Sequence, residues 1–503
     1  MKKILLYIPI LLLAGSCSKF LEPKSQTEYI PRDVNSLNEL LIGKAYLDPN
    51  SQSAPVFSYN EIFSDDWVCS AENSTNTNNL SKYPKYKPFF AWHPNMFKLA
   101  SNEGTYQNVW KYTYENILGC NAVLDYIQDL TGTENEKNYV KGQAFALRSF
   151  YYFQLVNLFG EPYNYNKEAL GVPLKLNSNL ELNYPKRATV KEVYEQIDKD
   201  LNDAEFYYTN LPADKQFTRD GRINLPMIQF MKARVALFKE DYEAVISNGL
   251  KVLNNWGLKL LDLNSFTSTS AQPYYLFSSY NNPEAVWLFG NTFDFNRFST
   301  ETLYYLPTST YQTRKMFSAS ASLLSSFETS DLRKTNYILK ESTTISNLTP
   351  SGKIPVNTLY NGISTEFGRA LRLSEVYVML AEAYYKTNRH ADAVKILEDL
   401  RIKRFSSNSG NAYKVPAESS SGEALFSFIK AERRREMCFE GLRWFDLRRW
   451  GMESFSREWK EEGLVIATFT LEKNDPAFTL PIPFDAIEKN PNLVQNKLTT
   501  PKY

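Results

Sequence analysis

Histidine and cysteine are scarce in this chain of 503 residues. Its two histidines are His93 and His390, too few to favour a hydrolase with a histidine base or a metal held by imidazoles. The four cysteines form no CxxC pair and no cluster with histidine, so the sequence predicts neither a zinc site nor a disulfide framework. Glycine-rich phosphate loops are also lacking. We therefore expect no metal site and no cofactor.

An excess of charge of one sign is lacking as well. The formal net charge is +1, and removal of a leader that holds Lys2 and Lys3 takes it to about −1. A chain with no basic excess is a poor candidate for binding nucleic acid. No Gly/Ser-rich or Pro-rich linker divides the chain, and its hydrophobic content of 43% supplies ample material for a core. Length alone would allow two or three domains, and one globular domain over residues 17–503, which we predict, is equally compatible.

The first 16 residues have the pattern of a secretory leader. Two lysines precede an apolar run over residues 4–13, which is too short for a permanent membrane span. Small residues then come directly before Cys17, as in a lipoprotein signal, although Ala14 stands where leucine is usual. We predict cleavage after residue 16 and lipidation of Cys17, with a structural cysteine as the alternative. The lipid would be the only anchor, because no other apolar run reaches membrane length.

Apolar residues recur at helical spacing through much of the chain. Residues 107–130 and 136–159 show this spacing, and the short break between them predicts two antiparallel helices. Thr189, followed by Glu192 three residues later, predicts a capping box that opens a helix through residue 207. A further helical hairpin is expected from Leu225–Lys239 and residues 242–254.

The clearest repeat covers residues 375–400. Large and small residues there follow the tetratricopeptide consensus, in which small residues let paired helices approach. The matching positions are Tyr377, Leu380, Ala381, Tyr384, Ala393, Leu397 and Leu400. We therefore predict a mostly α fold with a tetratricopeptide-like core of helical hairpins that carries long inserted irregular loops.

Two aromatic segments interrupt the helical pattern. Residues 83–97 contain three prolines, so we expect a stiff loop and no helix there. Between residues 260 and 361 the periodicity fades, which predicts long irregular structure. Tryptophan and tyrosine on such loops can stack on the apolar faces of sugar rings. We predict ligand binding by Trp92, Trp287 and Tyr304, with core packing as the alternative for each.

Residues 431–451 mix charge and aromatic surface more densely than any other stretch. Glu432, Glu436 and Glu440 recur at the i, i+4 spacing and would repel one another on an exposed helix. Neighbouring arginines are therefore expected to neutralise them in an ion-pair lattice. The expected arginines are Arg433, Arg435, Arg443, Arg448 and Arg449, and the expected aromatic cover is Phe439, Trp444, Phe445 and Trp450. We interpret the motif as structural, with Glu432, Arg433, Arg434, Glu436 and Asp446 as its members.

The stretch ERRREMCFEGLRWFDLRRWG resembles the C-terminal signature of the SusD/RagB family of outer-membrane nutrient-binding lipoproteins. Three more segments are similar to family motifs: GQAFALRSFYYFQLVNLFGEPY at 142–163, RLSEVYVMLAEA at 372–383 and LPIPFDAIEKNPNLVQN at 480–496. Together the four cover the mature chain nearly end to end. The resemblance implies an N-terminal family region over 17–255 and a C-terminal one over 256–503.

The same resemblance implies a function. Family members bind oligosaccharides or polysaccharides at the outer cell surface and work with a SusC-like TonB-dependent transporter, so we expect a lipid-anchored glycan-binding protein and no enzyme. Two alternatives stay open: a tetratricopeptide scaffold for a protein or peptide, and a surface hydrolase. Asp65 and Asp66 could supply carboxylates to a hydrolase, but adjacent residues cannot easily face one sugar ring together. We expect these aspartates to cap a helix or turn.

Overall fold

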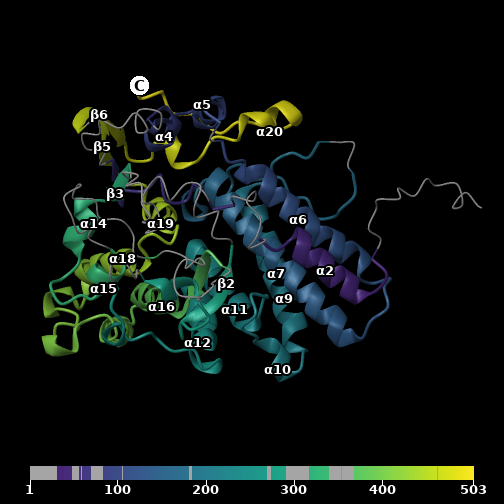
Figure 1. The fold of residues 1–503 in the computed structure, drawn as a ribbon, viewed down its shortest axis with the longest axis horizontal. Coiled ribbons are helices and arrows are strands. Elements are labelled where there is room, and N and C mark those ends of the chain that lie inside the picture. Colours follow the sequence, from purple (N-terminus) through teal and green to yellow (C-terminus); the bar gives the residue numbers. More distant parts are fainter. Residues whose placement is uncertain are drawn as a thin grey trace, which may run out of the picture.

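The computed structural model describes residues 31–47, 56–57, 59–69, 83–104, 106–180, 184–268, 274–290, 316–338, 353, 367–461 and 463–503. Helices dominate these residues, as predicted (Figure 1). The described helices are α2 (Val34–Lys44), α4 (Tyr83–Phe90), α5 (Met96–Asn102), α6 (Val109–Tyr126), α7 (Glu134–Phe159), α8 (Tyr163–Asn166), α9 (Val190–Thr209), α10 (Ala213–Gln216), α11 (Leu225–Lys239), α12 (Tyr242–Asn255), α14 (Ala321–Ser326), α15 (Arg333–Asn336), α16 (Leu373–Lys386), α17 (His390–Arg401), α18 (Gly422–Met437), α19 (Arg443–Arg449) and α20 (Phe484–Lys489).

The first predicted pair of helices is α6 and α7, which pack against each other. The predicted capping box opens α9: the Thr189 hydroxyl accepts a hydrogen bond from the Glu192 N–H at 3.1 Å, and the Glu192 carboxylate accepts one from the Thr189 N–H at 2.7 Å. Helix α9 packs on α7 at Gly142, where a Cβ atom would lie 2.6 Å from the Tyr208 ring. Only glycine therefore permits this close approach.

Two helical hairpins, α11–α12 and α16–α17, form the predicted tetratricopeptide-like core. Leu380, Ala381, Ala393, Leu397 and Leu400 are fully buried, as their consensus positions require. The hairpins stack because α12 packs on α16, and Gly249 of α12 lies directly against a leucine and a valine of α16. The mostly α, tetratricopeptide-like fold is thus confirmed.

Three two-stranded antiparallel sheets lie within the described residues. They pair β1 (Trp67–Cys69) with β3 (Phe317–Ala319), β2 (Ala285–Phe289) with β4 (Arg369–Arg372), and β5 (Phe455–Glu461) with β6 (Leu464–Leu471). The register aligns Trp67 with Ala319, Phe289 with Arg369, and Phe455 with Leu471. The stretch 260–361 therefore contains strands and short helices where irregular structure was expected.

Helix α4 corrects the prediction that residues 83–97 form a stiff loop. Pro84 lies in the first turn, where a backbone N–H has no partner within the helix. Pro88 lies inside the helix and costs a hydrogen bond there, but Phe89 and Phe90, which follow it, are fully buried. Burial of these rings offsets the cost of the proline, a balance that local propensity does not predict.

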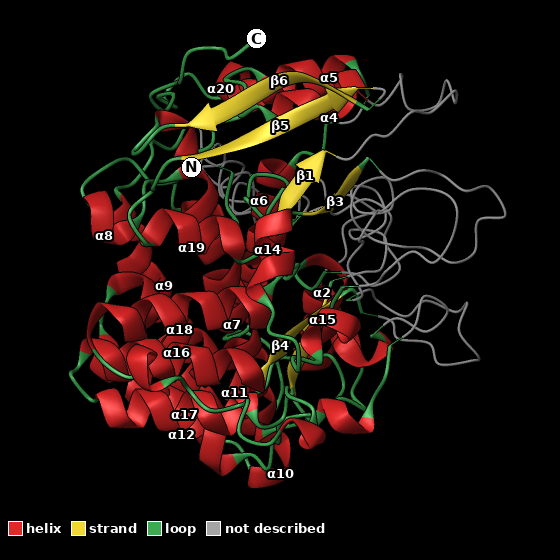
Figure 2. Ribbon diagram, turned by 90° about the vertical axis from the view of Figure 1, so that its left-hand side faces the viewer, coloured by secondary structure: helices red, strands yellow, loops and turns green. Residues whose placement is uncertain are grey.

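The sheet β5–β6 lies with α4, α5 and α20 at one end of the molecule, and the hairpins α11–α12 and α16–α17 lie toward the other (Figures 1 and 2). Helices α7, α18 and α19 lie between these ends (Figure 2). Within the described ranges, no helix combines the length and the apolar character needed to cross a bilayer.

Candidate functional site

Two carboxylates of α18 occupy the centre of a buried ion-pair network. Glu436 is fully buried and pairs with Arg404 at 3.0 Å, Arg333 at 3.2 Å and Arg372 at 3.2 Å. Glu432 is also fully buried and pairs with Arg435 at 2.6 Å, Arg333 at 2.7 Å and Arg401 at 2.8 Å. Their neighbour Glu440 pairs with Lys353 at 2.5 Å and with Arg372. Within the described residues the three glutamates of this motif are thus held in a network of ion pairs.

The partners of these glutamates are mostly not the predicted ones. Of the five expected arginines, only Arg435 pairs with the glutamate ridge in the described part of the chain. The remaining arginines that pair with these glutamates were not predicted. They come from α15, from β4, from the last residue of α17 and from the turn after it, and are Arg333, Arg372, Arg401 and Arg404. Helix α18 turns its glutamates toward these elements, so residues distant in sequence supply the positive charge.

Arg433 serves a second buried cluster that joins α16, α18 and α19. Its guanidinium lies 2.8 Å from the carboxylate of Asp446 and 3.3 Å from that of Glu375. Arg449 pairs with Asp446 at 2.8 Å and donates to Glu382 at 2.7 Å. These charge-assisted bonds fix the three helices relative to one another.

Arg434 lies at the edge of the motif, where it pairs with Asp66 at 2.6 Å and with Asp65 at 3.4 Å. Asp65 also forms a bidentate pair with Arg443, at 2.6 and 2.7 Å. The prediction that these aspartates cap a helix or turn is therefore wrong. They tie the N-terminal segment before β1 to α18 and α19, and both carboxylates are engaged by arginine.

The arginines decide the protonation state of the central carboxylates. Burial alone would raise the pKa of Glu436, but Arg404, Arg372 and Arg333 outweigh it and hold that pKa well below its ordinary value. The same balance, with Arg333 as its largest favourable charge, holds the pKa of Glu432 well below the ordinary range. Both groups stay ionised at neutral pH, so neither can act as a general acid.

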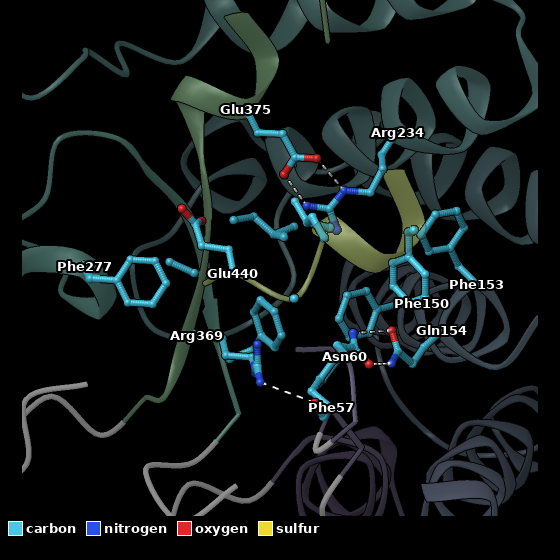
Figure 3. Close-up of a pocket in the computed structure, with 16 residues that line it drawn as sticks. Phe57, Asn60, Phe150, Phe153, Gln154, Arg234, Phe277, Arg369, Glu375 and Glu440 are labelled. Atoms are coloured by element: carbon cyan, nitrogen blue, oxygen red, sulfur yellow. Dashed lines mark hydrogen bonds and ion pairs between the residues drawn. The ribbon is translucent and has the colours of Figure 1, made fainter. Parts of the chain in front are cut away.

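A small cavity lies beside the network (Figure 3). Phe57, Phe150 and Arg369 are among its walls, and its volume is about 40 Å³. Two pairs seen in the same view are already satisfied: Arg234 donates to Glu375 at 3.0 Å, and Gln154 donates to Asn60 at 2.7 Å. The space holds a few waters, whereas small-molecule sites have roughly 300–1,000 Å³. A sugar ring does not fit there.

Trp92 and Trp287 are core residues in this structure. Trp92 is 0% exposed, donates its indole N–H to Phe63 O at 3.2 Å and lies 4.1 Å from the Arg457 guanidinium. Trp287 is 1% exposed, donates to Gly221 O at 3.0 Å and stacks on Phe289 with ring centres 4.6 Å apart. Burial contradicts the prediction that these rings stack on a sugar. Tyr304 and Cys17 lie outside the described residues.

Three open hollows surround the turn after α19. The first, the Leu447 hollow, has about 280 Å³ and lies between α18 and α19, with Leu447 and Trp450 on its walls. The second, the Trp450 hollow, has about 260 Å³, and its walls include Asn164, Phe426 and Trp450. The third, the Tyr165 hollow, has about 250 Å³ and lies between α8 and the segments around 452, 474 and 496.

The Tyr165 hollow has the most polar side chains of the three. Its walls include Tyr165, Asn166, Asn474, Asp475, Asn496 and Lys497. Sequence reasoning missed these residues, although the alternation of tyrosine and asparagine over Tyr163–Asn166 was a visible signal. In the part of the chain that the structure describes, no group of three or more His, Cys, Asp or Glu side chains could hold a metal ion.

Comparisons with known proteins agree with this fold and motif. A family model described as "Starch-binding associating with outer membrane" matches residues 19–218, and the SusD family model matches residues 299–503. SusD-like protein P2 of Formosa agariphila is 24% identical over 451 residues, which cover 80% of this chain and 82% of that protein.

Solved structures have the same fold. A SusD superfamily protein of Bacteroides thetaiotaomicron has a TM-score of 0.68 at 21% identity, over 92% of this chain and 100% of that one. A "Laminarin binding SusD-like protein" has a TM-score of 0.64 at 20% identity, over 94% and 100%. Family models match the chain at both ends, and its fold is that of solved SusD-like proteins. Both findings agree with the resemblance of the α18–α19 motif to the family signature. The chain belongs to the SusD/RagB family.

Proposed function

We propose that this protein is a lipoprotein of the outer cell surface that binds oligosaccharide nutrients and delivers them to a SusC-like TonB-dependent transporter. The observation that carries the proposal is the match of two family models over residues 19–218 and 299–503, one of them described as starch-binding and associated with the outer membrane. A structural relative named for laminarin binding supports a carbohydrate ligand. The leader and Cys17 support attachment by a lipid.

The carboxylates nearest the motif, Asp65 and Asp66, are paired with arginines, which bears on whether the protein is a hydrolase. Glycosidases place two carboxyl groups on either side of a sugar, roughly 5–9.5 Å apart, with one free to give a proton. Here Asp65 and Asp66 are held by Arg443 and Arg434. Pairing with arginine therefore argues against Asp65 and Asp66 as the two carboxyl groups of a hydrolase.

Calorimetric titration of the mature protein tests the proposal. The probes are neutral hexasaccharides of β-1,3-glucan, α-1,4-glucan, β-1,4-xylan and β-1,4-mannan, and we expect saturable binding of at least one with no release of reducing ends. Co-purification of the tagged protein with an outer-membrane transporter tests the delivery step. Binding of no glycan together with capture of a peptide ligand would instead favour the scaffold alternative.

A further inference from the structure

The Tyr165 hollow combines one open aromatic face with unused polar groups. Tyr165 is 55% exposed, and within the described residues its ring has no aromatic or cationic neighbour. Tyr385 is an example of a partly exposed tyrosine whose ring is already engaged: it stacks on His390 and on Phe426, with ring centres 5.2 and 5.0 Å away. Two rings thus occupy Tyr385, whereas the ring of Tyr165 remains available to a ligand.

Several polar side chains of the hollow lack partners in the described structure. The side-chain amides of Asn166 and Asn474 bond to no described residue. The Glu161 Oε2 atom is buried without a hydrogen-bond partner among the described residues. A buried acceptor without a partner is unfavourable unless water or a ligand hydroxyl reaches it. These groups therefore suit a ligand that carries many hydroxyls.

The walls of the hollow are held rigidly. Asn496 donates its amide to Phe159 O at 2.8 Å and to Leu480 O at 2.7 Å. Met452 and Asn474 both have left-handed backbone, with φ of 49° and 58°, and the Asn474 N–H donates to Met452 O at 3.0 Å. A methionine in this conformation is costly, and such local strain is often found where a site must be preformed.

Charge within the hollow is balanced. Glu161 and Lys497 line it with opposite signs, and Asp475 is paired with Lys502 at 3.0 Å. A strongly charged ligand would therefore gain little electrostatic attraction in this hollow. The same short helix, α8, contributes Asn164 to the Trp450 hollow and Tyr165 with Asn166 to this one, so one element lines both hollows.

We propose that the Tyr165 hollow binds one neutral sugar ring of an oligosaccharide, with the ring stacked on Tyr165 and its hydroxyls bonded to Asn166, Asn474 and Glu161. The next sugar would extend over α8 into the Trp450 hollow. This inference rests on the proposed glycan-binding function and assigns it a site. Flat aromatic faces and nearby amides are the groups that recognise apolar ring faces and equatorial hydroxyls.

Tyr165→Ala in the mature protein tests the site by calorimetric titration with the four neutral hexasaccharides. We expect the affinity for the bound hexasaccharide to fall about tenfold or more, because the apolar ring face loses its cover. Tyr165→Phe keeps that face and should stay within about threefold of wild type. Tyr126→Ala is the matched control, because Tyr126 is 54% exposed and lies on α6, outside the three hollows.

Three results would overturn the inference. If wild type and Tyr165→Ala bind a hexasaccharide equally well, the site is wrong and the proposed function stands. Equal losses for Tyr165→Ala and Tyr126→Ala would mark a general effect of surface change and contradict the site as well. A wild-type protein that binds none of the four glycans contradicts the proposed function and, with it, this inference.

Discussion

At the scale of single residues, Glu61 differs from the carboxylates of α18 because it is buried without an arginine hydrogen bond among the described residues. Its Oε1 atom accepts a hydrogen bond from the Gly441 N–H, and its Oε2 atom has no described partner. Burial raises the pKa of Glu61 to about 7. The pKa of a glutamate in the unfolded chain is about 4.3, so between that pH and the folded pKa the folded state binds more protons at Glu61 than the unfolded state does. The contribution of Glu61 to the free energy of unfolding therefore declines as the pH rises through this window.

Glu61→Gln should remove this decline, because glutamine keeps an acceptor for Gly441 and carries no charge at any pH. We expect the variant to be more stable than wild type by about 1–3 kcal/mol near pH 8 and to lose that advantage near pH 5. Urea unfolding of both proteins at the two pH values measures the difference. An equal effect at both would show that Glu61 does not titrate in this window.

Glu436→Gln should destabilise the protein, whereas Glu61→Gln should stabilise it near pH 8. It removes a fully buried charge that neutralises Arg404, Arg372 and Arg333, which we expect to lower the free energy of unfolding by about 3–5 kcal/mol at neutral pH. Glu195→Gln is the control, since Glu195 is 63% exposed opposite Lys191 and its pair is worth about 0–1 kcal/mol. Equal costs in urea unfolding would contradict the role of the network.

Residue type alone could not separate core aromatics from surface ones. Trp92 and Trp287 have the side chains of a sugar platform, but long-range packing covers them with residues such as Arg457 and Phe150. Tyr165 was not predicted because its exposure depends on where α8 lies relative to segments about 300 residues later, including Asn474. Exposure is a property of the assembled chain.

At the scale of elements, a glycine within a helix can be a packing requirement or a local weakness. Gly142→Ala would place a Cβ atom 2.6 Å from the Tyr208 ring, which is fully buried. We expect a loss of about 1–3 kcal/mol in spite of the better helix propensity of alanine. Gly43 of α2 has no atom within 4 Å of its Cβ direction, so Gly43→Ala should stabilise by up to about 1 kcal/mol.

Thermal unfolding of the two glycine variants compares these effects. Opposite signs are expected, and a stabilised Gly142→Ala would mean that α7 and α9 can move apart without cost. The comparison isolates helix packing, because both substitutions add the same methyl group to a helix.

Elements were predictable where one stretch of sequence contains all the information. The capping box of Thr189 and Glu192 and the helical periodicity before Phe159 and Lys239 are local, and their helices were found correctly. Strand pairing is not local. Trp67 pairs with Ala319 across about half of the chain, so β1 and β3 could not be found from either segment by itself.

At the scale of the whole molecule, attachment to the membrane should depend on one thiol. Cys17→Ala should leave the folded protein intact and move it from the detergent phase to the aqueous phase, since no described helix can span a bilayer. Phase partitioning of wild type and variant measures this. The variant should keep the melting temperature and glycan affinity of the mature protein, and continued detergent partitioning would contradict lipidation at Cys17.

The ion pairs of the N-terminal segment also set when that segment can dock on α18 and α19. Asp66 pairs with Arg434 and Asp65 with Arg443 across separations of 368 and 378 residues. Closing loops of that length costs entropy before any contact forms, and topologies of this kind fold slowly. A growing chain lacks the counter-charges of Asp66 and Asp65 until α18 and α19 have been made. Docking of the segment before β1 is thereby a late step of folding, which the N-terminal part of the chain cannot complete by itself.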